Sequence, residues 1–256
     1  MFFKKNKTVC GGIKSPLDKR DHIKSYVGKA TNAVVVGDTL VDYVGSIINQ
    51  GDYGSCGGCA GVYMANILMC KALGKPYDFK LNPMFSYYWG KYYSNFDVHS
   101  DVGSTARGVL KGMQKQGVWS CSMRYPESDI PTDFNSERAF KIQNYERING
   151  LGNELVENLK YTLSMEKLPV MATIMLYEEN IDAKTGAMNV VGYENEIGYH
   201  IMCICGFEEE LGETYFIAPN SWGRDWGDNG FAKIHQDVIA NFSLTAELWC
   251  PIKEYY

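Results

Sequence analysis

The sequence lacks any apolar run long enough for a secretory signal or a membrane span. Its N-terminus, MFFKKNKTVCGG, has two phenylalanines and three lysines but no apolar segment of signal-peptide length. The most apolar stretch, GVYMANILMCKALG, contains Asn66 and Lys71 and is too short to cross a bilayer. We therefore expect a protein with a cytoplasmic location and no membrane partner.

Positive charge is also scarce, because 25 Lys and Arg residues stand against 30 Asp and Glu, a net charge of −5. This balance argues against nucleic acid or an anionic membrane as the main partner. The sequence has no internal repeat and no low-complexity tract, and nothing in it indicates an oligomeric state. It does contain eight cysteines, which we expect to be reduced thiols because no secretory signal is visible.

The first half of the chain predicts helices. Residues 1–30 are polar and turn-rich and are expected to form an extended N-terminal arm that docks on the body. Residues 31–130 are expected to form a helical lobe that starts with a short β-branched run at Val34–Val36. Apolar patterns with capping residues and terminal glycines predict helices over 56–73, 83–93 and 104–117.

The second half predicts a strand-rich lobe over residues 131–256, entered near Tyr125–Pro131, where two prolines interrupt the pattern. One further helix is expected over 151–166. Short apolar runs bounded by glycine, asparagine and acidic residues then predict strands at 168–176, 199–207, 213–220 and 230–235. Helices followed by strands indicate an α+β fold with two lobes.

The stretch NQGDYGSCGGCAGVYMAN places Cys56 and Cys59 three residues apart at the start of the first helix. A redox pair would use the helix N-terminus to stabilise a thiolate, but a thioredoxin-like pair follows a strand, and here a glycine-rich loop precedes it. A zinc site could add Cys203 and Cys205, although two residues of one strand lack the usual turn between ligands. Buried filling is the ordinary role of a free cysteine. A nucleophile is the fourth interpretation.

Two segments later in the chain favour the nucleophile. GYHIMCICGF places His200 at the start of an apolar strand, and NSWGRDWGDNG begins with Asn220. A cysteine at a helix N-terminus, a histidine 144 residues later and an asparagine 20 further on form the Cys-His-Asn order of a nucleophilic triad.

These segments together resemble the papain-like cysteine peptidases. NQGDYGSC is similar to the Gln-Gly loop that leads into the nucleophile of that family, GYHIMCICGF to its His strand, and PNSWGRDWGDNGF to its Asn-Ser-Trp-Gly segment. Intervening segments resemble prokaryotic and viral members, so the likeness runs from about Ser15 to Ile239. The resemblance implies a papain-like fold with a helical lobe, a β-barrel-like lobe and a substrate cleft between them.

The resemblance also implies roles for individual residues. Cys56 takes the nucleophile position, and Cys59, one turn further on, takes a core position. His200 is the expected general base, oriented by Asn220, and Gln50 is the expected side-chain donor of the oxyanion hole. The implied reaction is hydrolysis of peptide bonds in a peptide or protein substrate through a thioester, with no metal or organic cofactor.

Substrate contacts are expected from five residues. Trp222 is expected to cover the His–Asn hydrogen bond, and Tyr199 lies directly before His200. Ser100 and Gly103 lie in SDVGSTARG, which resembles in part the loop of the main specificity pocket. Gly57 stands where the family commonly has an aromatic residue, which puts the shape of the substrate site in doubt.

Two further departures concern the segments around the nucleophile. Tyr53 replaces the cysteine that forms a disulfide in secreted relatives, so Cys70 is expected to be a free thiol. In this sequence 55 residues precede Cys56, fewer than an inhibitory pro-domain usually needs. We hypothesise that the enzyme is made active or is restrained by its own arm.

Other functions remain open at this stage. A papain-like protein could bind peptides with little or no catalysis, and Cys56 with Cys59 could form a redox-regulated pair. A transferase or ligase could use the same acyl-enzyme. His22, His99 and His235 have no motif around them and are expected to be surface or structural residues.

Overall fold

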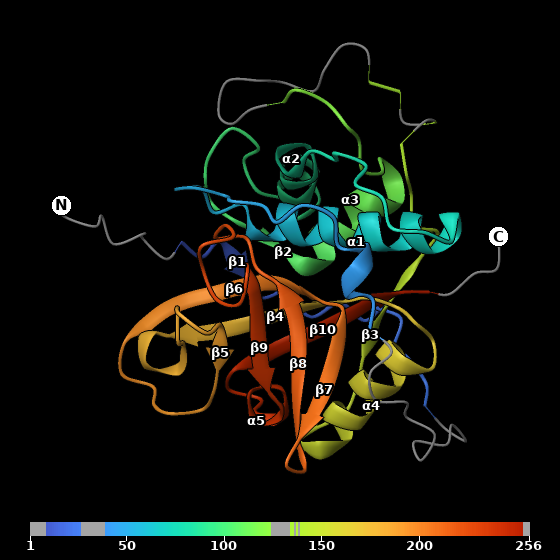
Figure 1. Cartoon of the computed structure of the whole chain (residues 1–256). Coiled ribbons are helices and arrows are strands. Elements are labelled where there is room, and N and C mark those ends of the chain that lie inside the picture. The colour runs from blue at the N-terminus through green and yellow to red at the C-terminus, as the bar shows by residue number, and fades with distance from the viewer. Residues whose placement is uncertain (1–8, 27–38, 124–133, 136, 138, 253–256) are drawn as a thin grey trace.

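The computed structural model describes residues 9–26, 39–123, 134–135, 137 and 139–252. Three helices, α1 (Cys56–Leu73), α2 (Pro83–Tyr93) and α3 (Ala106–Lys115), pack together on one side of the molecule, and two sheets lie on the other (Figure 1). The three predicted helices of the first half are confirmed, the third with two residues fewer at each end.

Helix α1 is buried over most of its length, as its apolar sequence requires. Glycines allow close neighbours here: a Cβ at Gly58 would lie 2.3 Å from the Pro83 carbonyl oxygen, and one at Gly61 would lie 2.6 Å from Ser86 Oγ. These positions let α2 pack directly on the first turns of α1 and so fix the place of Cys56. By length and composition α1 could cross a membrane, but 72% of its apolar window is buried inside the protein.

The first sheet contains four antiparallel strands in the order β3–β10–β4–β6. They are β3 (Tyr145–Ile148), β10 (Thr245–Pro251), β4 (Val170–Tyr177) and β6 (Glu196–Ile204). The second sheet has the order β5–β9–β8–β7. Its strands are β5 (Ala187–Met188), β9 (Phe231–His235), β8 (Glu213–Pro219) and β7 (Gly206–Glu210). The chain passes from the first sheet to the second at Cys205, between β6 and β7.

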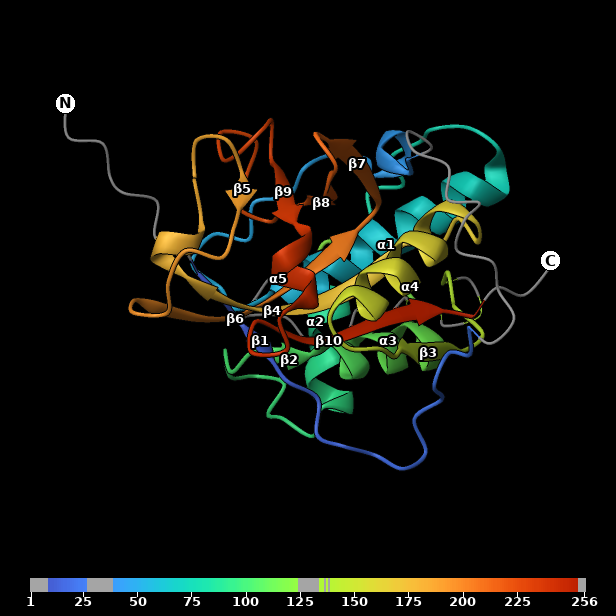
Figure 2. The ribbon, with the colours of Figure 1, turned by 90° about the horizontal axis from the view of Figure 1, so that it is seen from below.

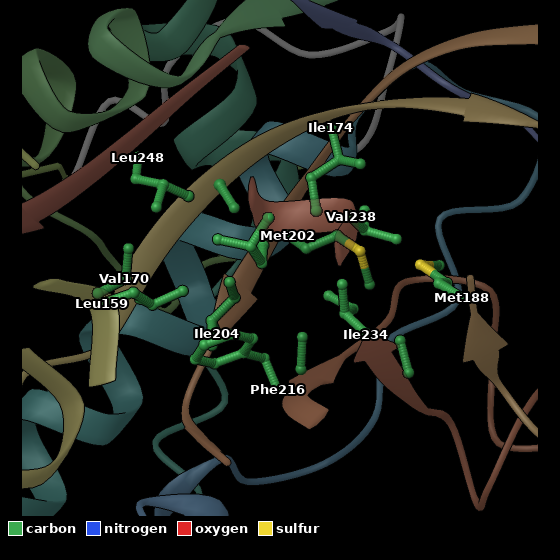
Figure 3. Close-up of a cluster of buried hydrophobic side chains, with 14 of the residues drawn as sticks. Leu159, Val170, Ile174, Met188, Met202, Ile204, Phe216, Ile234, Val238 and Leu248 are labelled. Carbon is green, nitrogen blue, oxygen red and sulfur yellow. The ribbon is translucent and has the colours of Figure 1, made fainter. Parts of the chain in front are cut away.

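Helices α4 (Asn153–Ser164) and α5 (Gln236–Ala240) cover the sheets, which Figure 2 shows from below. Two 3₁₀ helices, Val41–Tyr43 and Glu178–Asn180, complete the described elements. Apolar side chains of both sheets and of α4 and α5 point toward one another in one core (Figure 3), among them Leu159, Val170, Ile174, Met202, Ile204, Phe216, Ile234, Val238 and Leu248.

A second core joins the helices to the first sheet. Buried side chains of α1 and α3 pack with Ile201 and Cys203 of β6, Met171 of β4 and Trp249 of β10. Burial of apolar area stabilises such contacts by about 25 cal/mol per Å². The N-terminal half of α1 is thus held against β6, the strand that carries His200.

The N-terminal arm crosses the junction of helices and sheets. Its residues form β1 (Gly12–Ile13), which pairs in parallel with β2 (Ser104–Thr105) just before α3. Side chains anchor the arm further along: Ser15 to Glu247, Asp21 to Arg107, and Lys24 to Glu146 and Glu166. The described part of the predicted arm, residues 9–26, therefore docks on the body, whereas its predicted limits at residues 1 and 30 lie outside the described residues.

Two expectations from the sequence lie outside the described residues, namely the run Val34–Val36 and the lobe boundary at Tyr125–Pro131. The lobe limits at residues 30 and 130 therefore stay predictions.

Candidate active site

Cys56 is the first residue of α1, and its side chain is fully buried. Burial raises the pKa of this thiol above its ordinary value. Backbone N–H groups of Ile201, Gly11, Gly57 and Cys56 itself oppose this effect by stabilising a thiolate, as the unpaired N–H groups at a helix N-terminus do. The sulfur thus lies in a dry site that is already lined with donors for negative charge.

His200 lies on β6, and its Nε2 is 2.8 Å from Asn220 Oδ1. The backbone N–H of Ser221 donates to the same Asn220 oxygen at 2.8 Å, which identifies that atom as an acceptor. Nε2 therefore carries the proton, and Nδ1 is the basic nitrogen of the ring. Among the described residues Nδ1 has no hydrogen-bond partner.

The His200 ring is fully buried, and burial lowers its pKa to about 4, opposed by the Asn220 hydrogen bond. Trp222 covers the ring at a centroid distance of 4.7 Å and an interplanar angle of 30°. Trp226 in turn packs edge-on against Trp222. The indole shields the His200–Asn220 hydrogen bond from water, as expected for Trp222.

The packing of α1 on β6 brings the cysteine and the histidine together. A Cβ at Gly57 would lie 3.2 Å from Ile201 Cδ1, so the residues that follow Cys56 and His200 are in contact. The backbone N–H of Ile201 also acts on the Cys56 sulfur. Tyr63 strengthens the connection, because its hydroxyl donates to the Asn220 carbonyl oxygen at 3.0 Å.

Gln50 reaches the same place through backbone pairing between two loops. Its N–H donates to the Ser221 carbonyl oxygen at 2.8 Å, and Asn49 pairs with Trp222 in an antiparallel bridge. The Ser221 hydroxyl donates to Gln50 Oε1, which turns Nε2 toward backbone carbonyl oxygens: Tyr53 O at 2.6 Å and Val9 O at 3.3 Å. The amide of Gln50 is thus an oriented donor that contacts Tyr53, in the loop before Cys56, and Val9 of the arm.

The N-terminal arm fills the space in front of these residues. The Val9 carbonyl oxygen accepts from Gln50 Nε2 at 3.3 Å and from Trp222 Nε1 at 3.1 Å. Gly11 then passes beside the Cys56 sulfur, and its carbonyl oxygen accepts from Ser104 N at 2.9 Å. The backbone of Val9 to Gly11 therefore covers the candidate catalytic residues.

Three glycines make this close passage possible. A Cβ at Gly11 would lie 2.0 Å from the Gly54 carbonyl oxygen, and one at Gly103 would lie 2.2 Å from the Gly11 carbonyl oxygen. Gly103 also has a φ of +80°, which disfavours any side chain. The arm fits at this point because all three residues lack a side chain.

The structure brings some of the expected substrate-binding residues to the arm. Gly103 and Trp222 contact it, and the Tyr199 carbonyl oxygen would lie 2.8 Å from a Cβ at Gly12. Ser100 instead donates to the Asp97 carboxylate. A side chain at Gly57 would point inward to Ser104 Oγ, Val109 and Ile201.

Asp101 belongs to the segment SDVGSTARG, but nothing in the sequence indicates its role. Both Asp101 carboxylate oxygens accept from the Gly54 N–H, at 3.0 and 3.1 Å, and one accepts from the Tyr87 hydroxyl at 2.7 Å. That hydroxyl accepts from the Gly103 N–H at 2.9 Å. Asp101 therefore joins the loop before Cys56 to the loop of Gly103. Only a lone aspartate in a loop marks it in the sequence.

The remaining candidates have other surroundings. Cys59 is fully buried with the side chains of Ser55 and Ser221 beside it, and burial raises its pKa. His99 packs edge-on against Tyr88, and His235 Nδ1 caps α5 by accepting from Asp237 N. In the described part of the chain, no group of three His, Cys, Asp or Glu side chains is placed to hold a metal ion.

Comparisons with known proteins show which family the chain belongs to. The family model described as papain family cysteine protease matches residues 38–252. An uncharacterized peptidase C1-like protein of Acanthamoeba polyphaga mimivirus is 27% identical over 218 residues, which span 80% of this chain and 68% of the viral protein. Cathepsin B-like cysteine proteinase 1 of Ostertagia ostertagi is 29% identical over 116 residues, 45% of this chain and 30% of the nematode protein.

Solved structures show the same fold. Xylellain, a cysteine protease from Xylella fastidiosa, superposes over 100% of both chains with a TM-score of 0.81 at 20% sequence identity. Procathepsin B S9 from Trypanosoma congolense superposes over 96% of this chain and 87% of its own, with a TM-score of 0.69 at 12% identity. The papain-like α+β fold expected from the sequence is confirmed, and the chain belongs to the papain family of cysteine proteases.

Proposed function

We propose that this protein is a cysteine-type peptidase that hydrolyses peptide bonds through a thioester on Cys56. The observation that carries the proposal is the His200–Asn220 hydrogen bond of 2.8 Å. This bond supports a proton on Nε2 and a basic Nδ1, on the strand that packs against α1. Peptides and proteins are the substrates that this chemistry serves.

The reaction proceeds in two halves. His200 Nδ1 takes the Cys56 proton, the thiolate attacks the substrate carbonyl carbon, and the imidazolium gives the proton to the leaving amine. Water, deprotonated by the same nitrogen, then hydrolyses the thioester and frees Cys56. Gln50 Nε2 and the Cys56 backbone N–H stabilise the oxyanion in both halves. The Val9 carbonyl oxygen on Gln50 Nε2 supports this role, because the amide already donates to a peptide carbonyl there.

Labelling with an epoxide-type cysteine-peptidase inactivator, followed by peptide mapping of the reduced full chain, tests the proposal. We expect modification of Cys56 alone, absent in Cys56→Ala and slower in His200→Ala, together with loss of peptide hydrolysis. Equal labelling of Cys56 and Cys59, or none once the arm is displaced, would contradict an activated nucleophile and favour a peptide-binding protein.

Replacing Gln50 with alanine is expected to lower kcat by about 10²–10³-fold, the usual effect of removing one oxyanion donor. The Cys56 thiol stays in place, so alkylation of Cys56 should change much less than turnover. Steady-state kinetics on a fluorogenic peptide beside iodoacetamide labelling rates would measure both. A parallel fall of turnover and alkylation would mean that Gln50 acts on the structure and not on the oxyanion.

The same proposal includes restraint of the peptidase by the arm. Residues Val9 to Gly12 occupy the position in which a substrate carbonyl group would contact Gln50 and Cys56. Gly11→Ala is expected to displace this segment, because the new Cβ would lie 2.0 Å from the Gly54 carbonyl oxygen. Peptide hydrolysis and alkylation of Cys56 should both become faster. The increase is about tenfold or more if the substitution weakens binding of the arm to the site by over 1.4 kcal/mol. Lys14→Ala is the matched control, because Lys14 is exposed in the same arm. Equal rates in both variants would sink the idea of a restraining arm.

A further inference from the structure

The arm carries a thiol into the active site. Cys10 lies between Val9, whose carbonyl oxygen accepts from Gln50 and Trp222, and Gly11, which passes beside the Cys56 sulfur. Its Cβ is 3.9 Å from the position of a Cβ at Gly198, two residues before His200. Cys10 is therefore fixed from both sides beside the reaction centre, and both cysteines are free thiols.

No other described cysteine is placed in this way. Cys59 is also close to Cys56, one turn further along α1, but it is fully buried with Ser55 and Ser221 beside it. Cys203, Cys205 and Cys250 are fully buried in the sheets, and Cys70 contacts the backbone of Tyr77. Cys121 is half-buried, and its carbonyl oxygen accepts from Asn82 Nδ2. Of the two described cysteines close to Cys56, Cys10 is the one that belongs to the arm.

We propose that Cys10 is the resolving thiol of Cys56, so that a hydroperoxide converts the pair into a Cys10–Cys56 disulfide that closes the site reversibly. The inference rests on the proposed function only in that Cys56 is the reactive thiol. A disulfide needs Cα atoms about 4.4–6.8 Å apart. The Gly11 nitrogen, two bonds from the Cys10 Cα, is already beside the sulfur. Burial raises the pKa of the Cys10 thiol, and Cys56 is close enough to raise it further. In the proposed disulfide the two side chains rotate toward each other while Gly11 stays beside Cys56.

The chemistry balances with hydrogen peroxide as the oxidant. The Cys56 thiolate attacks the peroxide, an S–O bond forms, the O–O bond breaks, and the departing hydroxide takes a proton to become water. The Cys10 sulfur then attacks the sulfenic sulfur, an S–S bond forms, and the sulfenic oxygen leaves as a second water with the Cys10 proton. Two thiols and one peroxide thus give one disulfide and two waters.

The position of the arm determines the order of the two oxidation steps. Burial suppresses ionisation of both thiols while the arm covers the site, so oxidation of Cys56 takes place when the arm is displaced. Return of the arm then delivers Cys10 to the sulfenic acid before a second peroxide can oxidise it to the sulfinic acid, which dithiols do not reduce. A dithiol reductant reopens the disulfide.

Peptide mapping under non-reducing conditions tests the proposal on the full chain. After equimolar hydrogen peroxide we expect a Cys10–Cys56 linked peptide in the wild type and in Cys59→Ser. In Cys10→Ser we expect Cys56 to stop at the sulfenic acid, which dimedone traps. Without dimedone, a second equivalent of hydrogen peroxide should convert that sulfenic acid to the sulfinic acid. Peptidase activity regained with dithiothreitol, relative to each untreated variant, should be at least about tenfold lower in Cys10→Ser.

Two results would overturn the inference: a Cys56–Cys59 linked peptide in the wild type, or equal recovery of activity in Cys10→Ser and wild type. The disulfide is detected by the mass of the linked peptide, so its detection does not depend on peptidase activity. A chain that forms the Cys10–Cys56 disulfide but cleaves no peptide would refute the proposed peptidase alone. A peptidase with no such linkage would refute the resolving thiol alone.

Discussion

Cys56→Ala is expected to lower kcat/KM for peptide hydrolysis by a factor of about 10⁵–10⁶, the size of effect seen when a nucleophile is removed from a triad. The thioester cannot form without the sulfur, whereas Gln50 and the backbone N–H groups still bind a carbonyl oxygen. Substrate binding should therefore persist while turnover is lost. Steady-state kinetics on a fluorogenic peptide would measure turnover, and fluorescence anisotropy of a labelled peptide would measure binding.

Cys59→Ala is the matched control, because it removes a second buried thiol one turn further along α1. It leaves a small cavity whose cost is a loss of stability rather than of chemistry. We expect turnover within a few-fold of wild type and a lower melting temperature. Appreciable hydrolysis by Cys56→Ala, or a comparable loss in Cys59→Ala, would mean that the nucleophile has been assigned to the wrong thiol.

Local patterns in the sequence are sufficient to predict the helices and strands that carry the candidate site. The limits of three helices are predicted to within two residues by the capping residues Asn82 and Thr105 and by the glycine that ends α1. The order of Cys56, His200 and Asn220 pointed to a triad whose His–Asn hydrogen bond the structure contains. These features follow from residues close together in sequence or from motif spacing, which periodicity and capping rules can read.

The path of the arm could not be predicted in the same way. Its position depends on contacts between Gly11, Gly54 and Gly103, which are far apart in sequence and have no side chains to form a pattern. The role of Asp101 is equally hidden, because a carboxylate in a loop is ordinarily solvated and here accepts from Gly54 N and Tyr87 Oη. Both features depend on contacts between residues far apart in the sequence. The sequence alone therefore supports only the hypothesis that the arm restrains the enzyme.

The position of the arm affects the ionisation of Cys56 and His200, the proposed catalytic pair. Burial raises the pKa of Cys56 above its ordinary value and lowers that of His200 to about 4. Between those values both groups are neutral, so a thiol and an imidazole face the arm instead of a thiolate and an imidazolium. When the arm leaves, water and the helix N-terminus favour the charged pair again.

His200→Ala tests this consequence and is expected to lower kcat by about 10⁴–10⁶-fold, because the imidazole that takes the Cys56 proton in the proposed mechanism is lost. In the intact chain, alkylation of Cys56 should be slow at pH 7 and rise about tenfold per pH unit toward alkaline pH, since only the rare thiolate reacts. In Gly11→Ala the rate should form a plateau over about pH 5–8, where the ion pair persists. Adding His200→Ala to Gly11→Ala should replace this plateau with a single rise centred near pH 8.5, the ordinary value for a free cysteine. A plateau that survives in the double variant would show that some other base ionises Cys56, and the pairing of Cys56 with His200 would then have to be abandoned.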